Sequence, residues 1–212
     1  MTMTRRSVLA ATLASAIAGS RPAFGADAPV AAPVDAEAVL RFWFVELEPR
    51  DWWRKDPELD RRIASRFGAL LEAAASGALA DWRGTARGRL AEIIVLDQFT
   101  RNIHRGSAAA FANDALALRL AEEAVATGAA LELPVEERRF FYMPYMHSES
   151  AAVHEVAMRL FATPGLEKNL DFERRHKAVI DRFGRFPHRN ALLGRASTAE
   201  EIAFLKEPGS SF

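Results

Sequence analysis

Apolar residues recur at intervals of three and four along most of the chain, which is the spacing of helices that bury one face. The clearest example starts at Pro57, where Leu59, Ile63 and Phe67 lie one turn apart and the pattern stops at Gly77. Alternation of apolar and polar residues over several positions, which would indicate a half-buried strand, is absent. The pattern therefore predicts an all-α domain with no β-strand.

The spacing predicts about eight helices, whose starts carry helix-initiating residues such as Asp35, Pro57 and Ser148. Pro144 is expected to kink or end the fifth helix, because it lacks an amide hydrogen. Short loops join the helices, so sequence neighbours should pack as antiparallel hairpins. The predicted ranges are 35–49, 57–77, 85–102, 113–128, 134–144, 148–164, 169–183 and 197–205.

The first 26 residues have the features of a secretory signal. Arg5 and Arg6 precede a short Ala-rich apolar run, and small residues surround Phe24. The paired arginines and the weak hydrophobicity favour twin-arginine export, and the run is shorter than the ~20 residues that span a bilayer. We expect a signal peptide at 1–26, a linker at 27–34 and one helical domain at 35–212, exported to the periplasm as a soluble protein.

Composition and motifs exclude several kinds of partner and of chemistry. The formal net charge is zero, and the signal contains three arginines and no acid, so the mature chain is slightly acidic. Nucleic acid and membrane surfaces are therefore not expected partners. The absence of cysteine excludes disulfides and thiolate chemistry. No metal-ligand motif and no glycine-rich phosphate loop occur, so neither a metal nor a cofactor is expected.

Candidate chemistry is concentrated in three stretches, residues 97–102, 142–149 and 183–190, which mix arginine, histidine, amide and aromatic side chains. We expect the three stretches to meet in the fold. Asp97 lies on the inward stripe of its predicted helix, and a buried carboxylate costs several kcal/mol unless it is paired. Arg101, one turn further on, is one available partner, and Arg185 and Arg189 are others.

Three interpretations of these stretches remain open. The first is a binding module for a small anionic ligand or a peptide terminus. The second is a hydrolase-type enzyme with His147 as general base and Glu149 or Asp97 as its orienting carboxylate. The third is a purely structural polar cluster. The candidate residues are Asp97, Arg101, Asn102, His147, Glu149, Arg185, His188, Arg189 and Asn190.

Other polar residues are expected to have only structural roles. His176 lies on an apolar stripe with Phe172 and is expected to be a core histidine. Arg61, Arg62 and Arg66 lie opposite the apolar stripe of their helix and are expected to form a solvated face.

Several motifs carry a family resemblance. They read LDQF at 96–99, YMP at 142–144, HSE at 147–149, RFGRFPHRN at 182–190 and LGR at 193–195. With them the chain resembles a bacterial domain-of-unknown-function family, number 924, over residues 37–212. The resemblance implies a tetratricopeptide-like helical fold and brings no established activity. Thr100, His104 and His154 depart from the family pattern, so His104 and His154 are weak candidates for a shared mechanism.

Overall fold

Helices follow one another along residues 34–211, the part of the chain that the computed structural model describes. No β-strand occurs in that part, which confirms the all-α prediction. The signal peptide predicted at 1–26 lies outside the described residues, as does nearly all of the linker predicted at 27–34. The tetratricopeptide-like comparison stays a prediction.

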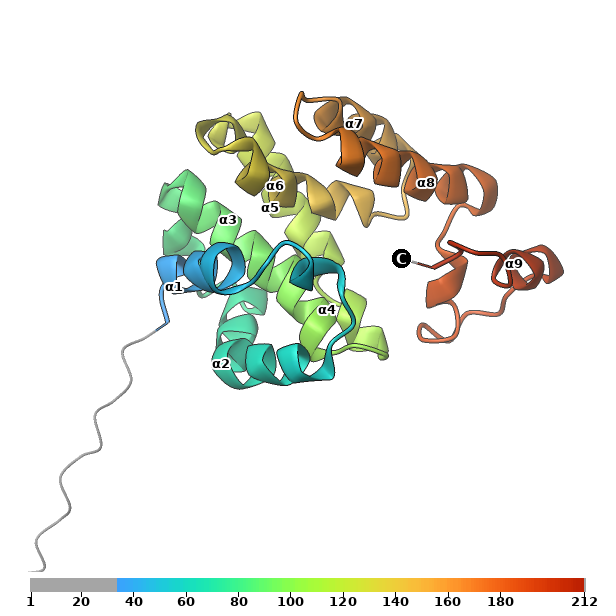
Figure 1. Cartoon of the computed structure of the whole chain (residues 1–212), viewed down its shortest axis with the longest axis horizontal. Coiled ribbons are helices and arrows are strands. Elements are labelled where there is room, and N and C mark those ends of the chain that lie inside the picture. Colours follow the sequence, from blue (N-terminus) through green and yellow to red (C-terminus); the bar gives the residue numbers. More distant parts are fainter. Residues whose placement is uncertain (1–33, 212) are drawn as a thin grey trace, which may run out of the picture. The chain divides into compact units, whose positions relative to one another are not determined.

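Nine α-helices and several tighter or wider helical turns make up the described chain (Figure 1). The α-helices are α1 (Ala36–Arg41), α2 (Pro57–Ala75), α3 (Ala86–Ile94), α4 (Thr100–Ile103), α5 (Asp114–Ala126), α6 (Val135–Met146), α7 (Ala151–Phe161), α8 (Glu167–Phe183) and α9 (Ala199–Phe204). The 3₁₀ turns are Asp51–Trp53, Ala80–Gly84, Ala108–Phe111, Ala129–Glu132 and Pro187–Arg189. Two π-helical turns, Phe42–Glu46 and Val95–Phe99, follow α1 and α3.

Local chemistry explains where several helices begin. The Asp35 carboxylate accepts a hydrogen bond from the Ala38 amide at 2.8 Å, and Asp56 caps α2 in the same way. Thr198 and Glu201 form a capping box at the start of α9. These starts depend only on neighbouring residues, which is why they can be read from the sequence.

Several helix boundaries differ from the prediction, and three of them involve a proline or a predicted first turn. Helix α6 continues past Pro144 to Met146, since only one amide hydrogen is lost and the aromatic residues before it are anchored in the core. Helix α7 starts at Ala151, so Glu149 lies in the preceding loop instead of the first turn. Helix α8 starts at Glu167, which places Asn169 inside the helix.

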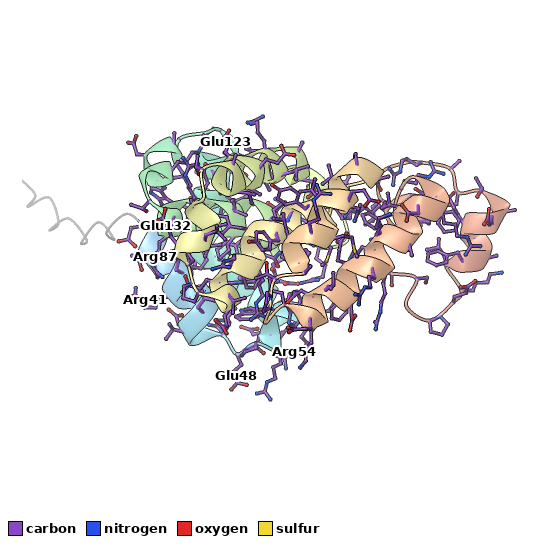
Figure 2. The ribbon with its side chains drawn as sticks, turned by 90° about the horizontal axis from the view of Figure 1, so that it is seen from above. Arg41, Glu48, Arg54, Arg87, Glu123 and Glu132 are labelled. Carbon is purple, nitrogen blue, oxygen red and sulfur yellow. The ribbon has the colours of Figure 1, made fainter. Side chains whose placement is uncertain are left out.

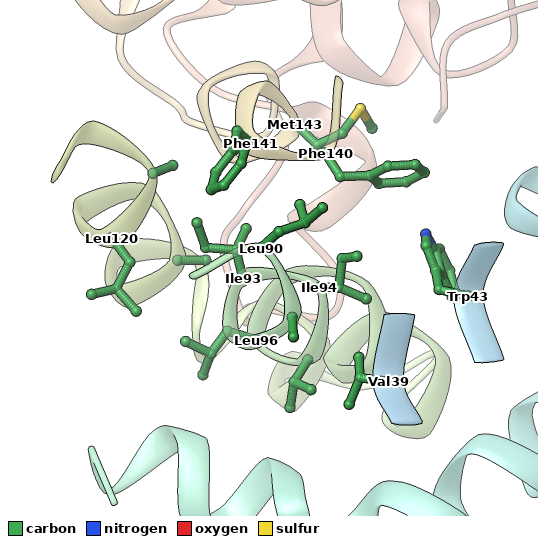
Figure 3. Close-up of a cluster of buried hydrophobic side chains, with 14 of the residues drawn as sticks. Val39, Trp43, Leu90, Ile93, Ile94, Leu96, Leu120, Phe140, Phe141 and Met143 are labelled. Atoms are coloured by element: carbon green, nitrogen blue, oxygen red, sulfur yellow. The ribbon is translucent and has the colours of Figure 1, made fainter. Parts of the chain in front are cut away.

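The main core surrounds α3, which packs against α1, α5 and α6. In Figure 3 Leu90 and Ile93 of α3 face Phe141 of α6, while Trp43 and Leu120 approach from other elements. Leu90 and Phe141 are fully buried. Burial on several sides exceeds the single inward stripe that predicts this helix, and it fixes the position of the π-turn that follows.

A surface arginine joins the elements around this core. Arg87 of α3 pairs with Glu37 of α1 at 2.7 Å and with Glu137 of α6 at 3.1 Å. Figure 2 shows Arg87 at the outer edge of the helices. Because the guanidinium is partly exposed, such pairs contribute little individually to stability, but they reinforce the orientation of three helices.

The C-terminal elements have a small core of their own. Val179, Ile180 and Phe186 are buried together, with Phe204 of α9 packed against them. Phe172, predicted on the inward stripe of α8, is instead 51% exposed. Within residues 34–211 no helix is both long and apolar enough to cross a membrane.

Candidate functional site

Asp97 and His147 meet although 50 positions separate them. Asp97 belongs to the π-turn Val95–Phe99, and His147 follows the last turn of α6. The Nδ1 atom of His147 lies 2.7 Å from Oδ1 of Asp97. The Asp97 side chain is 1% exposed and the His147 side chain 13%, so the pair joins a buried carboxylate to an imidazole near the surface.

Asp97 has two further partners from its own stretch. Arg101, one of its predicted partners, lies 3.1 Å from Oδ1 and also donates to the Asp97 backbone carbonyl at 2.8 Å. Gln98 donates through Nε2 to Oδ2 at 2.5 Å. The buried carboxylate is therefore fully paired, as the desolvation argument requires.

These contacts set the protonation states of the pair. Burial alone would raise the pKa of Asp97, but Arg101, His147 and Gln98 together lower it to about 2. Burial and the nearby Arg101 lower the pKa of His147, against the opposing effect of Asp97. At neutral pH the imidazole is thus neutral, with its Nδ1 hydrogen donated to Asp97.

The second nitrogen of His147, Nε2, differs from the first in its contacts. Among residues 34–211 it makes no hydrogen bond, whereas the first nitrogen is held by Asp97. A neutral imidazole that donates from Nδ1 carries a lone pair on Nε2. Nε2 is therefore the ring atom of His147 that can accept a proton.

Asp114, in the first turn of α5, links two arginines of the site. Its Oδ1 lies 2.9 Å from Arg101, and its Oδ2 lies 3.2 Å from Nη1 of Arg189. Arg189 also donates to the backbone carbonyl of His147 at 3.0 Å. An acid in the first turn of a helix is a common feature, so nothing in the sequence distinguishes Asp114 as a site residue.

Arg189 is held between two aromatic rings. Its guanidinium carbon lies 4.6 Å from the ring centroids of both Phe111 and Phe186. Burial, together with Arg101, lowers the pKa of Arg189 to about 10, although Asp114 opposes the shift. This arginine remains charged at neutral pH, and its contacts serve to dock the 187–189 turn beside His147.

Glu149 is not the carboxylate that orients His147. It accepts a hydrogen bond from the Phe186 amide at 2.8 Å and pairs with Arg195 through both oxygens, at 2.6 and 2.9 Å. These contacts connect the loop before α7 to the C-terminal segment. Arg195 belongs to the motif at 193–195, but nothing in the charge pattern of the sequence marks it as a site residue.

Arg185 and Asn190 lie in a separate polar cluster around Glu201. Arg185 binds both carboxylate oxygens of Glu201, at 2.7 and 2.8 Å, and Asn190 donates to the same group at 3.3 Å. Arg185 lowers the pKa of Glu201 to about 2. The expectation that Arg185 pairs with Asp97 is therefore wrong, because the capping box of α9 places Glu201 beside it.

The two remaining candidates, Asn102 and His188, contact other residues. Asn102 donates to Asp60 of α2 at 2.8 Å, beside Arg105, which pairs with the same carboxylate at 2.6 Å. His188 lies against Phe186, with ring centroids 5.6 Å apart. Burial and the neighbouring Arg189 lower the pKa of His188 to about 4.

A second histidine–carboxylate pair lies deeper in the protein. His154 of α7 contacts Glu173 of α8 through Nδ1 at 2.6 Å and the Ser148 carbonyl through Nε2 at 2.8 Å. Both side chains are fully buried, and burial raises the pKa of Glu173. The sequence does not predict this pair, and both ring nitrogens are engaged, so it joins α7 to α8 and offers no atom to a substrate.

No group of three or more histidine, aspartate or glutamate side chains within the described residues is arranged to hold a metal ion. The predicted meeting of the three polar stretches is observed in one place: the π-turn, the end of α6 and the 187–189 turn converge on Asp97, His147 and Arg189. The described chain is thus all-helical, and its candidate site is an aspartate–histidine pair in contact with two arginines.

Comparison with known proteins places the chain in a family. Residues 39–209 match the model of the family described as "Bacterial protein of unknown function (DUF924)", and the chain belongs to this family. A solved structure of a protein of unknown function from Agrobacterium tumefaciens is similar, with 37% identity and a TM-score of 0.77. The similarity covers 81% of this chain and 96% of that one. Among curated proteins none matches.

Proposed function

We propose that the protein is a hydrolase-type enzyme in which His147 acts as the general base. The observation that carries this proposal is the asymmetry of the His147 ring: Nδ1 is held by Asp97 at 2.7 Å, whereas Nε2 makes no hydrogen bond within residues 34–211. A carboxylate that fixes the tautomer and orientation of a histidine is the arrangement used for proton transfer in many hydrolases.

In the proposed reaction, Nε2 of His147 accepts a proton from a water molecule as that water attacks the substrate. Asp97 stabilises the resulting imidazolium, because its carboxylate is ionised and already bonded to Nδ1. Arg101 lies beside the pair, and its contacts with Asp97 and Asp114 hold the carboxylate in place. The proton then passes from the imidazolium to the leaving group, which restores the neutral histidine.

The two other interpretations receive less support from the contacts. A small anion or peptide terminus bound by the cluster needs cationic groups without carboxylate partners. Arg101 and Arg189 instead share Asp114, and Arg185 pairs with Glu201. A purely structural cluster explains these ion pairs. It does not explain why Nε2 of His147 makes no hydrogen bond within residues 34–211.

The test combines chemical labelling with activity. Diethylpyrocarbonate acylates accessible, unprotonated imidazole nitrogens, so we expect rapid modification of His147 at pH 7 and slow modification of the buried His154, measured by peptide mass spectrometry. On a panel of ester, amide and phosphoester substrates, His147→Gln and Asp97→Asn should each lower the hydrolytic rate by about a hundredfold or more. His104→Gln is the matched control and should retain the rate.

Circular dichroism at the assay temperature establishes that each variant is folded. This check is needed for Asp97→Asn in particular, because the substitution leaves Arg101 without its buried partner. If the wild-type protein hydrolyses nothing on the panel, or if His147 resists acylation as His154 does, the enzyme proposal fails and the structural interpretation stands.

We also propose that the protein is exported through the twin-arginine route and acts in the periplasm. The support is the sequence alone, namely Arg5 and Arg6 ahead of a short Ala-rich run and a small-residue cleavage site. Export of this kind carries folded proteins, so the helical domain would form before it crosses the membrane.

A further inference from the structure

A groove on α2 lies apart from the residues proposed for catalysis. Its volume is about 370 Å³, and it opens along the side of the helix that carries several arginines. The sequence pattern assigns these arginines to a solvated face, with no role beyond solubility. The residues that line the groove are Phe42, Glu58, Arg61, Arg62, Ser65 and Arg66.

The lining has an excess of positive charge. Arg61 pairs with Glu58 at 2.5 Å, and Arg66 pairs with Glu46, outside the lining, at 2.6 Å. Arg62 has no ion pair within residues 34–211. The carboxylates of Glu58 and Glu46 thus balance Arg61 and Arg66, which leaves the positive charge of Arg62 for a ligand.

The positive field reaches beyond the lining. Hydrogen bonding to Arg66 is the main cause that lowers the pKa of Glu46, and the charges of Arg41 and Arg62 lower it further. Figure 2 shows Arg41 on the outer side of the helices, pointing away from them. An anion that approaches this side of the protein therefore meets several arginines together.

Two of the arginines stack on a buried aromatic ring. The guanidinium carbons of Arg62 and Arg66 lie 5.5 and 5.1 Å from the ring centroid of Phe42. Phe42 is 1% exposed and packs against Phe67 and Phe99, with centroids 5.0 and 5.9 Å apart. Stacking on a fixed ring restricts the two guanidinium groups, so less conformational entropy is lost when they bind a ligand.

We propose that this groove binds a dianionic phosphate group, as in a small phosphate monoester. Phosphate oxygens accept hydrogen bonds from guanidinium forks in pairs, and the Ser65 hydroxyl in the lining adds a neutral donor. Arg62 supplies the uncompensated positive charge, and Arg61 and Arg66 add further N–H groups that line the groove. The groove is larger than a phosphate ion, so it has room for a small organic group attached to the phosphate.

The experiment uses inorganic phosphate as the probe. Isothermal titration calorimetry at pH 8 and constant ionic strength should give saturable binding that sulfate competes for and chloride does not. Arg62→Gln should weaken binding about tenfold, which corresponds to the loss of one charge-assisted hydrogen bond. Glu58→Gln should strengthen it, because Arg61 loses its competing carboxylate.

Arg174→Gln is the matched control. Arg174 is an exposed helical arginine like Arg62, but it pairs with Asp171 and lies on α8, outside the groove. Its substitution should leave phosphate affinity unchanged. Absence of saturable binding to the wild-type protein, or equal weakening by Arg62→Gln and Arg174→Gln, would overturn the proposal. Neither result depends on His147, so this site and the proposed enzyme activity are tested separately.

Discussion

Three histidines in this protein share one property, which is that burial lowers their pKa. The pKa of His147 is lowered by burial and Arg101, that of His176 falls to about 3 through burial, and that of His188 falls to about 4. In the unfolded chain each would take up a proton near pH 6.5. The folded protein resists this uptake, so protons bind preferentially to the unfolded state.

This difference predicts how stability depends on pH. A group whose pKa is depressed by folding contributes stability above its unfolded pKa, and that contribution is lost as the pH falls. The free energy of unfolding should therefore be highest near pH 7 and decrease from pH 6.5 towards 4.5. Burial raises the pKa of Glu173, which opposes the trend near the lower end of this range.

His176→Gln provides the measurement. His176 is buried on α8, and Nδ1 of its ring lies 2.8 Å from the Phe172 carbonyl, which a glutamine amide can also reach. We expect the variant to lose about 1.4 kcal/mol per pH unit of the slope below pH 6, measured by urea unfolding at several pH values. Equal slopes for the variant and the wild type would contradict the lowered pKa of His176.

At the scale of elements, the helix from α3 to α4 determines the position of the site. The π-turn Val95–Phe99 interrupts the regular helix and contains Asp97. π-turns are rare and occur frequently at functional sites. The start of this helix is fixed by Thr85, whose hydroxyl accepts a hydrogen bond from the Gly88 amide at 3.0 Å.

Two glycines in helices should respond to alanine in opposite ways. A Cβ atom on Gly88 would lie 2.0 Å from the Trp82 carbonyl oxygen, whereas one on Gly68 of α2 meets no atom within 4 Å. Gly88→Ala should destabilise the protein by about 2 kcal/mol or more through this backbone clash. Gly68→Ala should stabilise it by about 1 kcal/mol, since alanine favours the helix.

Thermal or urea unfolding of the two variants measures both effects. Each glycine is the control for the other, because the change of side chain is the same. Destabilisation by Gly68→Ala, or tolerance of Gly88→Ala, would show that packing near these helices differs from the contacts described.

At the scale of the whole molecule, the proposed export can be tested in cells. Replacing both Arg5 and Arg6 by lysine removes the paired arginines and keeps the charge of the segment. We expect the full-length precursor to accumulate in the cytoplasm, while the wild-type protein is recovered from the periplasm as a shorter chain. Cell fractionation and mass spectrometry of the mature N-terminus measure this.

The control for export is Arg21→Lys, which lies after the apolar run and should leave export unchanged. A periplasmic location of the Arg5→Lys, Arg6→Lys variant would exclude the twin-arginine route. Recovery of the wild-type protein only from the cytoplasm would exclude export altogether.

Much of this fold could be read from the sequence because its causes are local. The apolar spacing within each segment predicts the helices, and Asp35, Asp56 and Thr198 cap helices through residues two or three positions away. The inward position of Asp97 follows from the same periodicity, and so does its pairing with Arg101, which lies on the next turn of the helix.

The partners across the fold were decided by tertiary structure. With 28 acidic and 28 basic residues, many pairings are compatible with the sequence. Only the packing of α5, α9 and the loops places Asp114 beside Arg189, Glu201 beside Arg185 and Glu149 near the C-terminal segment. The sequence by itself determined the helices and a buried acid that requires cations, because periodicity and desolvation act locally. Contacts between segments far apart in the chain decided which other groups surround Asp97. The same contacts decided that Asp97 binds Nδ1 of His147 and leaves Nε2 able to accept a proton.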